Sequence, residues 1–214
     1  MIENLADYRK SYEKGELLEG AIPTTPFELF SKWFSEVENA GGVEEANAMT
    51  VASIDEDGFP KSRIVLLKSY NEKGFVFYTN YNSEKGKSLL NNPKVSLSFF
   101  WPNLERQVII KGEAKKLSEQ ESTSYFNKRP RGSKIGAWAS NQSEKITSRE
   151  VLSKKVLELE KKYADLPIPK PAHWGGFIVK ANTIEFWQGR PNRLHDRMLY
   201  TQESNKWIIN RLAP

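Results

Sequence analysis

Cysteine is absent from this chain of 214 residues, and histidine occurs only twice. Without cysteine the protein has no disulfide bond, no thiolate zinc site, no iron–sulfur cluster and no cysteine nucleophile. Neither His173 nor His195 has a second histidine at the spacing of a metal-ligand pair, so we expect no metal centre. Chemistry at a bound metal or at a reactive thiol is therefore not predicted.

Long apolar runs are also missing from the sequence. No segment approaches the ~20 apolar residues that a transmembrane helix needs. The first twenty residues are rich in charged side chains and lack the apolar stretch of a signal peptide. We therefore expect a soluble, cytoplasmic protein without a membrane partner. With 38% hydrophobic and 12% aromatic residues, the chain is large enough to bury one good core.

The net charge of +5 favours anionic partners, either small molecules that carry phosphate or nucleic acid. Charge alone does not choose between them. The segment 153–162 interleaves lysine with glutamate, a pattern that predicts a solvated helix face rather than a stripe of cations along a phosphate backbone. A nucleic-acid partner is therefore not expected.

Residues 1–24 are polar, lack periodicity and end in a proline-rich segment, so we predict a flexible N-terminal arm. A single domain is predicted from residue 25 to residue 214. It begins with a helix, because Thr25, Pro26 and Glu28 form an N-terminal capping pattern and apolar residues then recur at helical spacing as far as Gly41.

Residues 48–117 change to short apolar runs separated by turns, a pattern that predicts a meandering antiparallel sheet interrupted by a short helix at 83–90. Capping pairs then predict two helices, one begun by Ser118 with Glu121 and one by Thr147 with Glu150. The remainder returns to strands, including one predicted over 193–200. An α+β barrel of antiparallel strands with peripheral helices is the expected fold.

Three nucleotide or nucleophile motifs are rejected. Gly86-Lys87-Ser88 resembles the end of a phosphate-binding loop, but Tyr81 stands where that motif requires glycine. The glycine fingerprint of dinucleotide-binding sites does not follow any predicted strand. The nucleophile elbow of serine hydrolases does not occur.

Arg193, His195 and Arg197 alternate along a predicted strand, so all three side chains are expected on one face. One interpretation is a solvated edge strand. The other is a face directed at an anionic or electron-rich partner, whose developing negative charge a guanidinium would stabilise. The apolar residues that flank this segment favour the second interpretation.

Two further groups of cations suit phosphate. Tyr125 and Arg129 lie four residues apart in a predicted helix, and Ser133 follows in a predicted turn, so the three side chains could converge on one phosphate. A basic helix terminus that complements its own dipole explains the same pattern equally well. Arg63 and Lys68 bracket a predicted strand, where regular geometry would direct them to opposite faces.

Taken in order, several segments resemble the pyridoxine 5′-phosphate oxidase family in its bacterial, FMN-binding form. The resemblance runs from about residue 5 to Pro214, and its specificity lies in the joint order and spacing of the segments. They are Arg63-Ile-Val-Leu-Leu-Lys68, Phe77-Tyr-Thr-Asn80, Leu104-Glu-Arg-Gln107, Tyr125 with Arg129-Pro-Arg131, Ile135-Gly-Ala-Trp138, Gln142-Ser143, Trp174-Gly-Gly176, Trp187-Gln-Gly189, Arg193-Leu-His-Asp-Arg197 and Arg211-Leu-Ala-Pro214.

The resemblance implies a split β-barrel homodimer with FMN sites at the subunit interface. It implies oxidation of pyridoxine or pyridoxamine 5′-phosphate by O2 to pyridoxal 5′-phosphate, with release of H2O2. Carried over residue by residue, the FMN contacts would be Arg63, Lys68, Tyr78, Thr79, Lys85, Gln107, Gln142, Ser143, Trp187 and Arg197. The substrate contacts would be Lys68, Tyr125, Arg129, Ser133, Arg193 and His195, with Arg193 and His195 as catalytic residues and with Arg9 and Tyr12 contributed by the arm as a lid.

One position departs from the family. Glu84 stands between Ser83 and Lys85, where the family usually has arginine, so we expect weaker attraction for the flavin phosphate. Two alternatives stay open: another flavoenzyme on the same fold, and a protein without turnover, which is either a carrier of flavin or pyridoxal phosphate or a basic nucleic-acid binder.

Overall fold

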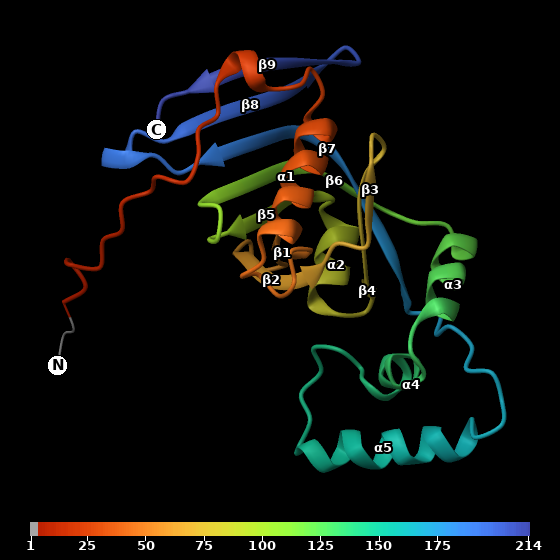
Figure 1. The fold of residues 1–214 in the computed structure, drawn as a ribbon. Coiled ribbons are helices and arrows are strands. Elements are labelled where there is room, and N and C mark those ends of the chain that lie inside the picture. The colour runs from red at the N-terminus through yellow and green to blue at the C-terminus, as the bar shows by residue number, and fades with distance from the viewer. Residues whose placement is uncertain (1–3) are drawn as a thin grey trace. The chain divides into compact units, whose positions relative to one another are not determined.

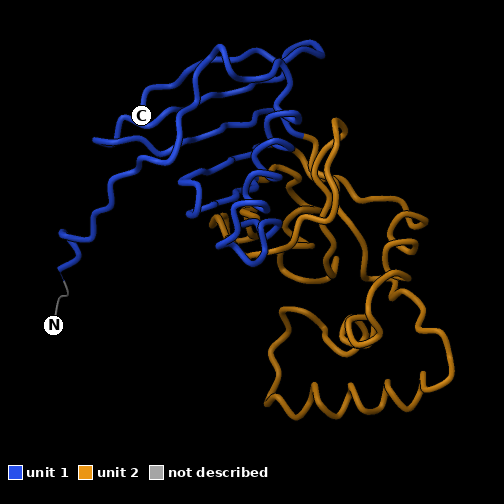
Figure 2. The backbone as a smooth tube through the Cα atoms, in the orientation of Figure 1, with its two compact units in different colours: residues 1–50, 96–111, 181–214 blue, residues 51–95, 112–180 orange. Residues whose placement is uncertain are grey.

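The computed structural model describes residues 4–214 (Figure 1). The first three residues of the predicted arm lie outside the described part of the chain. Two compact units are distinguished by their internal contacts, and each is assembled from separate stretches of sequence (Figure 2). Of the described residues, unit 1 comprises 4–50, 96–111 and 181–214, and unit 2 comprises 51–95 and 112–180.

Within residues 4–214 the strands form one nine-stranded sheet. Its hydrogen-bonded order is β2-β1-β5-β6-β7-β4-β3, with β8 paired to β7 and β9 paired to β8. The pairs β3–β4, β4–β7, β7–β8 and β8–β9 are antiparallel. Together with the helices, they confirm the predicted α+β class. The strands that contribute to both units are β1 (Ala48–Ile54), β5 (Lys94–Trp101), β6 (Arg106–Lys116) and β7 (Trp174–Gln188).

Unit 1 is organised around the helix α1 (Pro26–Ala40), which begins as predicted. The Thr25 hydroxyl accepts a hydrogen bond from the Glu28 backbone N–H at 3.4 Å, and Gly41 ends the helix with a φ of 66°. Phe30 on this helix is fully buried against Phe99 of β5 and Trp101, with ring centroids 5.2 and 6.0 Å away. The other elements of unit 1 are the 3₁₀ turns η1 (Glu19–Ala21) and η2 (Pro191–Arg193) and the strands β8 (Asp196–Glu203) and β9 (Lys206–Leu212).

Unit 2 contains a buried strand, β4 (Gly74–Asn80), that pairs with the first half of β7 and carries the site described below. Gly74 has a φ of 144°, and a Cβ atom there would lie 2.3 Å from the Val179 carbonyl oxygen, so the turn before β4 requires glycine. The other elements are β2 (Pro60–Leu66), β3 (Ser69–Asn71), α2 (Glu84–Asn91), α3 (Glu119–Lys128), α4 (Arg131–Ala139) and α5 (Arg149–Lys162).

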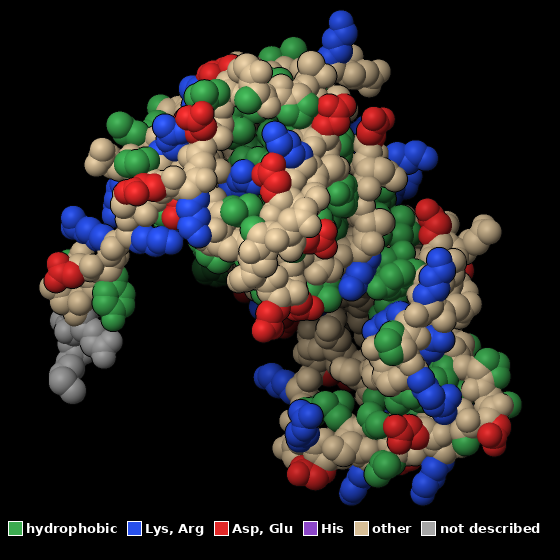
Figure 3. Space-filling view, in the orientation of Figure 1, with side chains coloured by type: hydrophobic (Ala, Val, Ile, Leu, Met, Phe, Trp, Pro, Cys, Tyr) green, Lys and Arg blue, Asp and Glu red, His purple; other side chains and the backbone are tan. Residues whose placement is uncertain are grey.

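Two helices of unit 2 were predicted from N-terminal capping pairs in the sequence. The capping box of Ser118 and Glu121 is present at the start of α3, as predicted. The last helix begins one residue later than predicted, with Ser148 at its N-cap. Its surface alternates basic and acidic side chains, in agreement with the predicted solvated face (Figure 3).

The turn predicted after Arg129 is wrong, because residues 131–139 form the helix α4. Ile135 of this helix belongs to a buried cluster with Phe126, Tyr163 and Trp174. Among the helices of residues 4–214, none combines the length and the apolar character that a membrane span requires.

Candidate functional site

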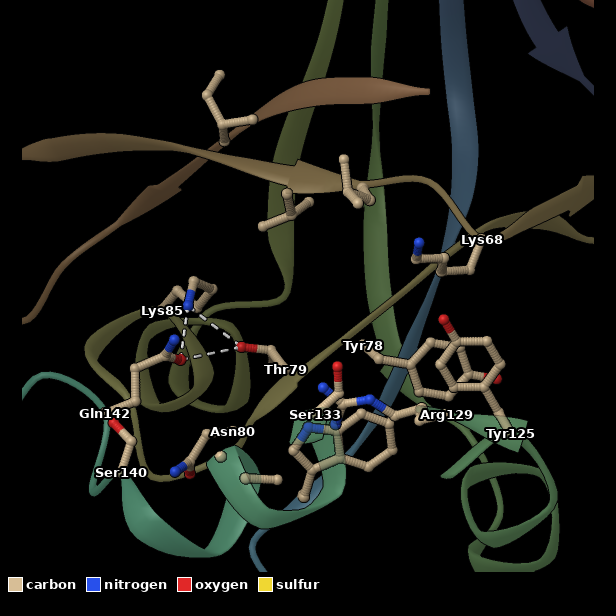
Figure 4. A pocket seen from close by; sticks show the side chains of 16 residues that line it. Lys68, Tyr78, Thr79, Asn80, Lys85, Tyr125, Arg129, Ser133, Ser140 and Gln142 are labelled. Atoms are coloured by element: carbon tan, nitrogen blue, oxygen red, sulfur yellow. Dashed lines mark hydrogen bonds between the residues drawn. The ribbon is translucent and has the colours of Figure 1, made fainter. Parts of the chain in front are cut away.

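A cavity of about 450 Å³ opens in unit 2, beside the end of β4 (Figure 4). This volume lies within the range of ~300–1,000 Å³ that is typical of small-molecule sites. The strands β2 and β4 and the helices α2, α3 and α4 all contribute to its lining. Eight of the predicted site residues line it: Lys68, Tyr78, Thr79, Lys85, Tyr125, Arg129, Ser133 and Gln142.

The first end of the cavity is built where β4 leads into α2. The Lys85 ammonium donates to the Thr79 hydroxyl at 3.2 Å and to the Gln142 side-chain carbonyl at 2.9 Å (Figure 4). Burial, followed by the positive charge of Arg63, lowers the pKa of Lys85 to about 8. This end therefore presents a partly buried cation whose two hydrogen-bond partners are neutral oxygens.

Arg63 and Ser143 are close to this end but do not line the cavity. The Arg63 guanidinium donates to the Ser53 hydroxyl at 2.7 Å and lies 3.8 Å from the Asp55 carboxylate. The Ser143 hydroxyl accepts a hydrogen bond from the Glu84 backbone N–H at 3.3 Å, which places it at the N-terminus of α2. A helix N-terminus with unpaired N–H groups favours a phosphate.

Stacked aromatic rings form the second end. The Tyr78 ring lies 3.9 Å from the Tyr125 ring and 5.3 Å from the Trp174 ring, centroid to centroid, with interplanar angles of 10° and 9°. Burial raises the pKa of both tyrosines, so their hydroxyls stay protonated and can donate at neutral pH. The stack makes this wall of the cavity rigid.

Arg129 lies against the same stack, with its guanidinium carbon 4.6 Å from the centroid of the Trp174 ring. Its Nη1 atom is buried and has no hydrogen-bond partner among the described residues. Burial lowers the pKa of Arg129, but an arginine stays charged at neutral pH. A buried guanidinium nitrogen without an acceptor is costly, and an anion in the cavity would remove that cost.

A second cavity, of about 320 Å³, shares this end. Lys68, Tyr125, Arg129 and Ser133 line both cavities, and Lys128 is added in the second. Lys68 lies in the link between β2 and β3, where the break in the strand directs it to the cavity while Arg63 remains outside. Of the two cations that bracket the predicted strand, only Lys68 therefore lines the cavity.

The two predicted catalytic residues belong to unit 1. The prediction that they lie on a strand with Arg197 is wrong, because η2 occupies residues 191–193 and β8 begins only at Asp196. Asn192 and Arg193 have φ angles of 58° and 63°, which no regular strand allows. Arg193 is exposed at this turn.

His195 is partly buried among aromatic rings. Its ring centroid lies 4.6 Å from that of Trp187 and 5.9 Å from that of Tyr12. Its Nδ1 atom accepts a hydrogen bond from the Arg190 backbone N–H at 3.1 Å. Burial, followed by the positive charge of Arg193, lowers the pKa of His195. The ring is therefore neutral at pH 7, with its proton on Nε2.

Arg197, Gln107 and Arg9 are the other predicted site residues of unit 1. Arg197 makes a bidentate ion pair with Glu185, with its Nε atom 2.8 Å from Oε1 and its Nη2 atom 3.2 Å from Oε2. This pair raises the pKa of the Arg197 guanidinium. Gln107 is partly buried on β6. Arg9 is exposed, with its Nε atom bonded to the Ala6 carbonyl oxygen.

Several lining residues were not among the predicted site residues. Trp174, Asn80 and Ser140 line the cavity with the apolar residues of β2. Trp174 and Asn80 both fall in segments that carry the resemblance, so their order in the sequence was a usable signal. Ser140 follows the unpredicted helix α4 and had no such signal.

Comparison with known proteins assigns the chain to a family. Residues 36–163 match the family model described as pyridoxamine 5′-phosphate oxidase. Residues 174–214 match the model of the pyridoxine 5′-phosphate oxidase C-terminal dimerisation region. A pyridoxine/pyridoxamine 5′-phosphate oxidase of Flavobacterium psychrophilum is 58% identical over 214 residues, which are 100% of both chains. Its counterpart in Flavobacterium johnsoniae is 58% identical over 213 residues, covering 99% of this chain and 100% of the relative.

A solved structure supports the same assignment. PhzG from Burkholderia lata, crystallised with tetrahydrophenazine-1-carboxylic acid, has a TM-score of 0.87 and 27% identity, and the match covers 94% of this chain and 100% of that one. These matches confirm the resemblance seen in the sequence: the chain belongs to the pyridoxine/pyridoxamine 5′-phosphate oxidase family of FMN-dependent oxidoreductases and has its split β-barrel fold.

Proposed function

We propose that this protein uses FMN to oxidise pyridoxine or pyridoxamine 5′-phosphate with O2, forming pyridoxal 5′-phosphate and H2O2. The observation that carries the proposal is a cavity of about 450 Å³ with cationic side chains at two ends. Acidic side chains are absent from the 16 described residues that line it. Two separate cationic ends suit two phosphates, one on the cofactor and one on the substrate.

The end that contains Lys85 is assigned to the FMN phosphate. A phosphate there would compensate the partly buried ammonium better than the neutral oxygens of Thr79 and Gln142 do. Arg63 and Ser143 add a cation and a hydroxyl from the adjacent strand and loop. The other proposed FMN contacts are Lys68, Tyr78, Gln107, Trp187 and Arg197.

The end that contains Arg129 is assigned to the substrate phosphate. Its unpaired Nη1 atom, the Tyr125 hydroxyl and the Ser133 hydroxyl are donors, and Lys68 adds a second cation. Charge-assisted hydrogen bonds of this kind are about twice as strong as neutral ones. The stack of Tyr78, Tyr125 and Trp174 holds the donors in place before the substrate arrives.

Arg193 and His195 are assigned to the substrate ring. When bound, the flavin supplies the acceptor for a hydride from the substrate's C4′ carbon and passes the electrons to O2. His195 keeps Nδ1 occupied by the Arg190 N–H, so its Nε2–H is the donor left for the substrate. Arg193 contributes a positive charge near the charge that develops in the reaction.

The matched dimerisation region, residues 174–214, supports a homodimer. That region contains Trp187, Arg193, His195 and Arg197, so the proposed ring-binding residues and two proposed FMN contacts belong to the part of the chain that dimerises. We propose accordingly that the FMN sites lie at the subunit interface. The arm of residues 1–24 is proposed as a lid on a functional domain of residues 25–214, with Arg9 and Tyr12 facing the substrate. A cytoplasmic location stays a prediction.

The proposal is tested by the dependence of turnover on the substrate phosphate. The protein with added FMN is given either pyridoxine 5′-phosphate or pyridoxine, and H2O2 release is measured. We expect kcat/KM to be at least a hundredfold higher for the phosphorylated substrate, since two cations and two hydroxyls are assigned to the phosphate. Equal rates would reject the assigned phosphate site, and no peroxide with either substrate would reject the oxidase.

A further inference from the structure

Glu105 is a buried carboxylate in unit 1 that the proposed chemistry does not use. Its side chain is only 2% exposed. One of its oxygens accepts backbone hydrogen bonds from Glu13 at 2.8 Å and from Lys14 at 3.0 Å, and the other lies 3.3 Å from the Lys10 ammonium. All three partners belong to the N-terminal arm. The carboxylate therefore connects the body of unit 1 to arm residues 10–14.

The backbone around Glu105 is fixed in an unusual conformation. Glu105 has a φ of 56°, in the left-handed region that only a well-determined environment maintains for a non-glycine residue. Its carbonyl oxygen accepts hydrogen bonds from the Gly189 backbone N–H at 2.8 Å and from the Gln188 side-chain amide at 3.3 Å. Gln188 is fully buried and also binds the Leu104 carbonyl oxygen. These contacts hold the Glu105 side chain toward the arm.

The arm segment that Glu105 binds carries Tyr12. The Tyr12 ring lies 5.8 Å from the Trp187 ring, edge to face, and 5.9 Å from the His195 ring. A Cβ atom at residue 189 would lie 2.8 Å from three Tyr12 carbon atoms, so Gly189 leaves the space into which Tyr12 packs. Glu105 and Gly189 thus place Tyr12 over two residues that the proposed function assigns to FMN and substrate.

Later arm residues are held by different groups. The Leu17 backbone N–H donates to Asp196 at 3.0 Å, and the Leu17 carbonyl oxygen accepts from Arg211 at 2.8 Å. These bonds do not involve Glu105, so residues from Leu17 onward can stay bound while residues 10–14 move. Burial by itself would raise the pKa of Glu105, but the bonds from Lys14, Glu13 and Lys10 outweigh it and lower that pKa. Glu105 therefore stays ionised at neutral pH.

We propose that Glu105 is a positioning residue: its carboxylate is the latch that closes arm residues 10–14 and so places Tyr12 over the substrate ring. The role of this latch in substrate binding rests on the proposed function. The binding of arm residues 10–14 to Glu105 does not depend on it. Opening would release the Glu13 and Lys14 N–H groups to water together, while residues from Leu17 onward stay bound.

The test compares the full-length protein with two variants, Glu105→Gln and Lys10→Met. Lys10→Met removes one partner of the Glu105 carboxylate by changing an exposed residue of the arm, and it leaves Glu105 in place. Glu36→Gln is the control, because Glu36 also forms an ion pair within unit 1, with Arg106, but does not contact the arm. Amide hydrogen exchange is measured for a peptide that covers residues 10–16. FMN affinity and the kcat and KM for pyridoxine 5′-phosphate are measured in parallel.

We expect both latch variants to exchange about tenfold faster at residues 13 and 14 and to raise KM about tenfold, equivalent to about 1.4 kcal/mol. Their kcat and FMN affinity should change less than twofold, and Glu36→Gln should match the wild type in every measurement. Amide exchange at residues 13 and 14 that stays as slow in both latch variants as in the wild type would contradict the proposal that Glu105 holds the arm. Faster exchange with an unchanged KM would overturn its positioning role. A wild-type protein that neither binds FMN nor oxidises the substrate would reject the proposed function and leave the exchange result standing.

Discussion

Arg129→Met is expected to change stability and substrate binding in opposite directions. In the free protein the Arg129 Nη1 atom is buried without an acceptor, while the guanidinium lies 4.6 Å over the Trp174 ring. Methionine fills a similar volume without charge, so it removes both the unsatisfied donor and the cation–π contact. The substrate phosphate, by contrast, loses a charged partner.

The magnitudes follow from these two contacts. An unsatisfied buried donor costs about 1–3 kcal/mol, and a cation–π contact stabilises by about 0.5–2 kcal/mol. The net change in the free energy of unfolding of the free protein therefore lies between about −1 and about +2.5 kcal/mol, and we expect a rise of about 1 kcal/mol. The loss of a charge-assisted bond to phosphate, about 1.5–3 kcal/mol, should raise KM for pyridoxine 5′-phosphate by about ten- to a hundredfold.

Urea unfolding of the flavin-free protein measures the first effect, and steady-state peroxide release measures the second. Arg131→Met is the control: the Arg131 guanidinium donates to the Tyr163 carbonyl oxygen at 2.7 Å and does not line the cavity, so this variant should lose stability and keep its KM. The reasoning is refuted if Arg129→Met destabilises the free protein by more than about 1 kcal/mol or leaves KM unchanged.

Three further predictions concern other parts of unit 2. FMN affinity, measured by flavin fluorescence, should fall as the pH rises through 8. The reason is that the pKa of Lys85 is lowered to about 8, so its ammonium loses its charge above that pH. Lys85→Arg should abolish this fall in affinity. Glu84→Arg should tighten FMN binding by about two- to fivefold. The gain is modest because Glu84 is half exposed and paired with Lys61. Unchanged or weaker affinity in a fluorescence titration would count against this prediction. Gly175→Ala should lower the free energy of unfolding by about 1–3 kcal/mol in urea, because its Cβ would lie 2.2 Å from the Tyr81 hydroxyl oxygen.

Local signals in the sequence predicted most element boundaries. The caps formed by Thr25 and by Ser118 with Glu121 involve residues three apart, so the pattern alone specifies their hydrogen bonds. The helix α4 lacks such a signal, because its N-cap is Pro130 without a capping side chain. Burial of Ile135 and other tertiary contacts stabilises it, and a single-sequence pattern does not contain them.

The site was predictable in composition more than in geometry. Eight predicted residues line one cavity, which the order of the family-like segments anticipated. The stack of Tyr78, Tyr125 and Trp174 joins three distant segments, and no local pattern indicates it. The failed strand prediction at Arg193 has a similar cause, since alternation of charges does not reveal the left-handed turn that places Arg193 outside β8.

The most direct test of the proposed function is the absorbance spectrum of the protein with bound FMN, recorded before and after anaerobic addition of pyridoxine 5′-phosphate and again after air is admitted. The account predicts that the visible flavin band bleaches on addition of the substrate and returns with O2. A flavin band that stays unchanged with this substrate would contradict it.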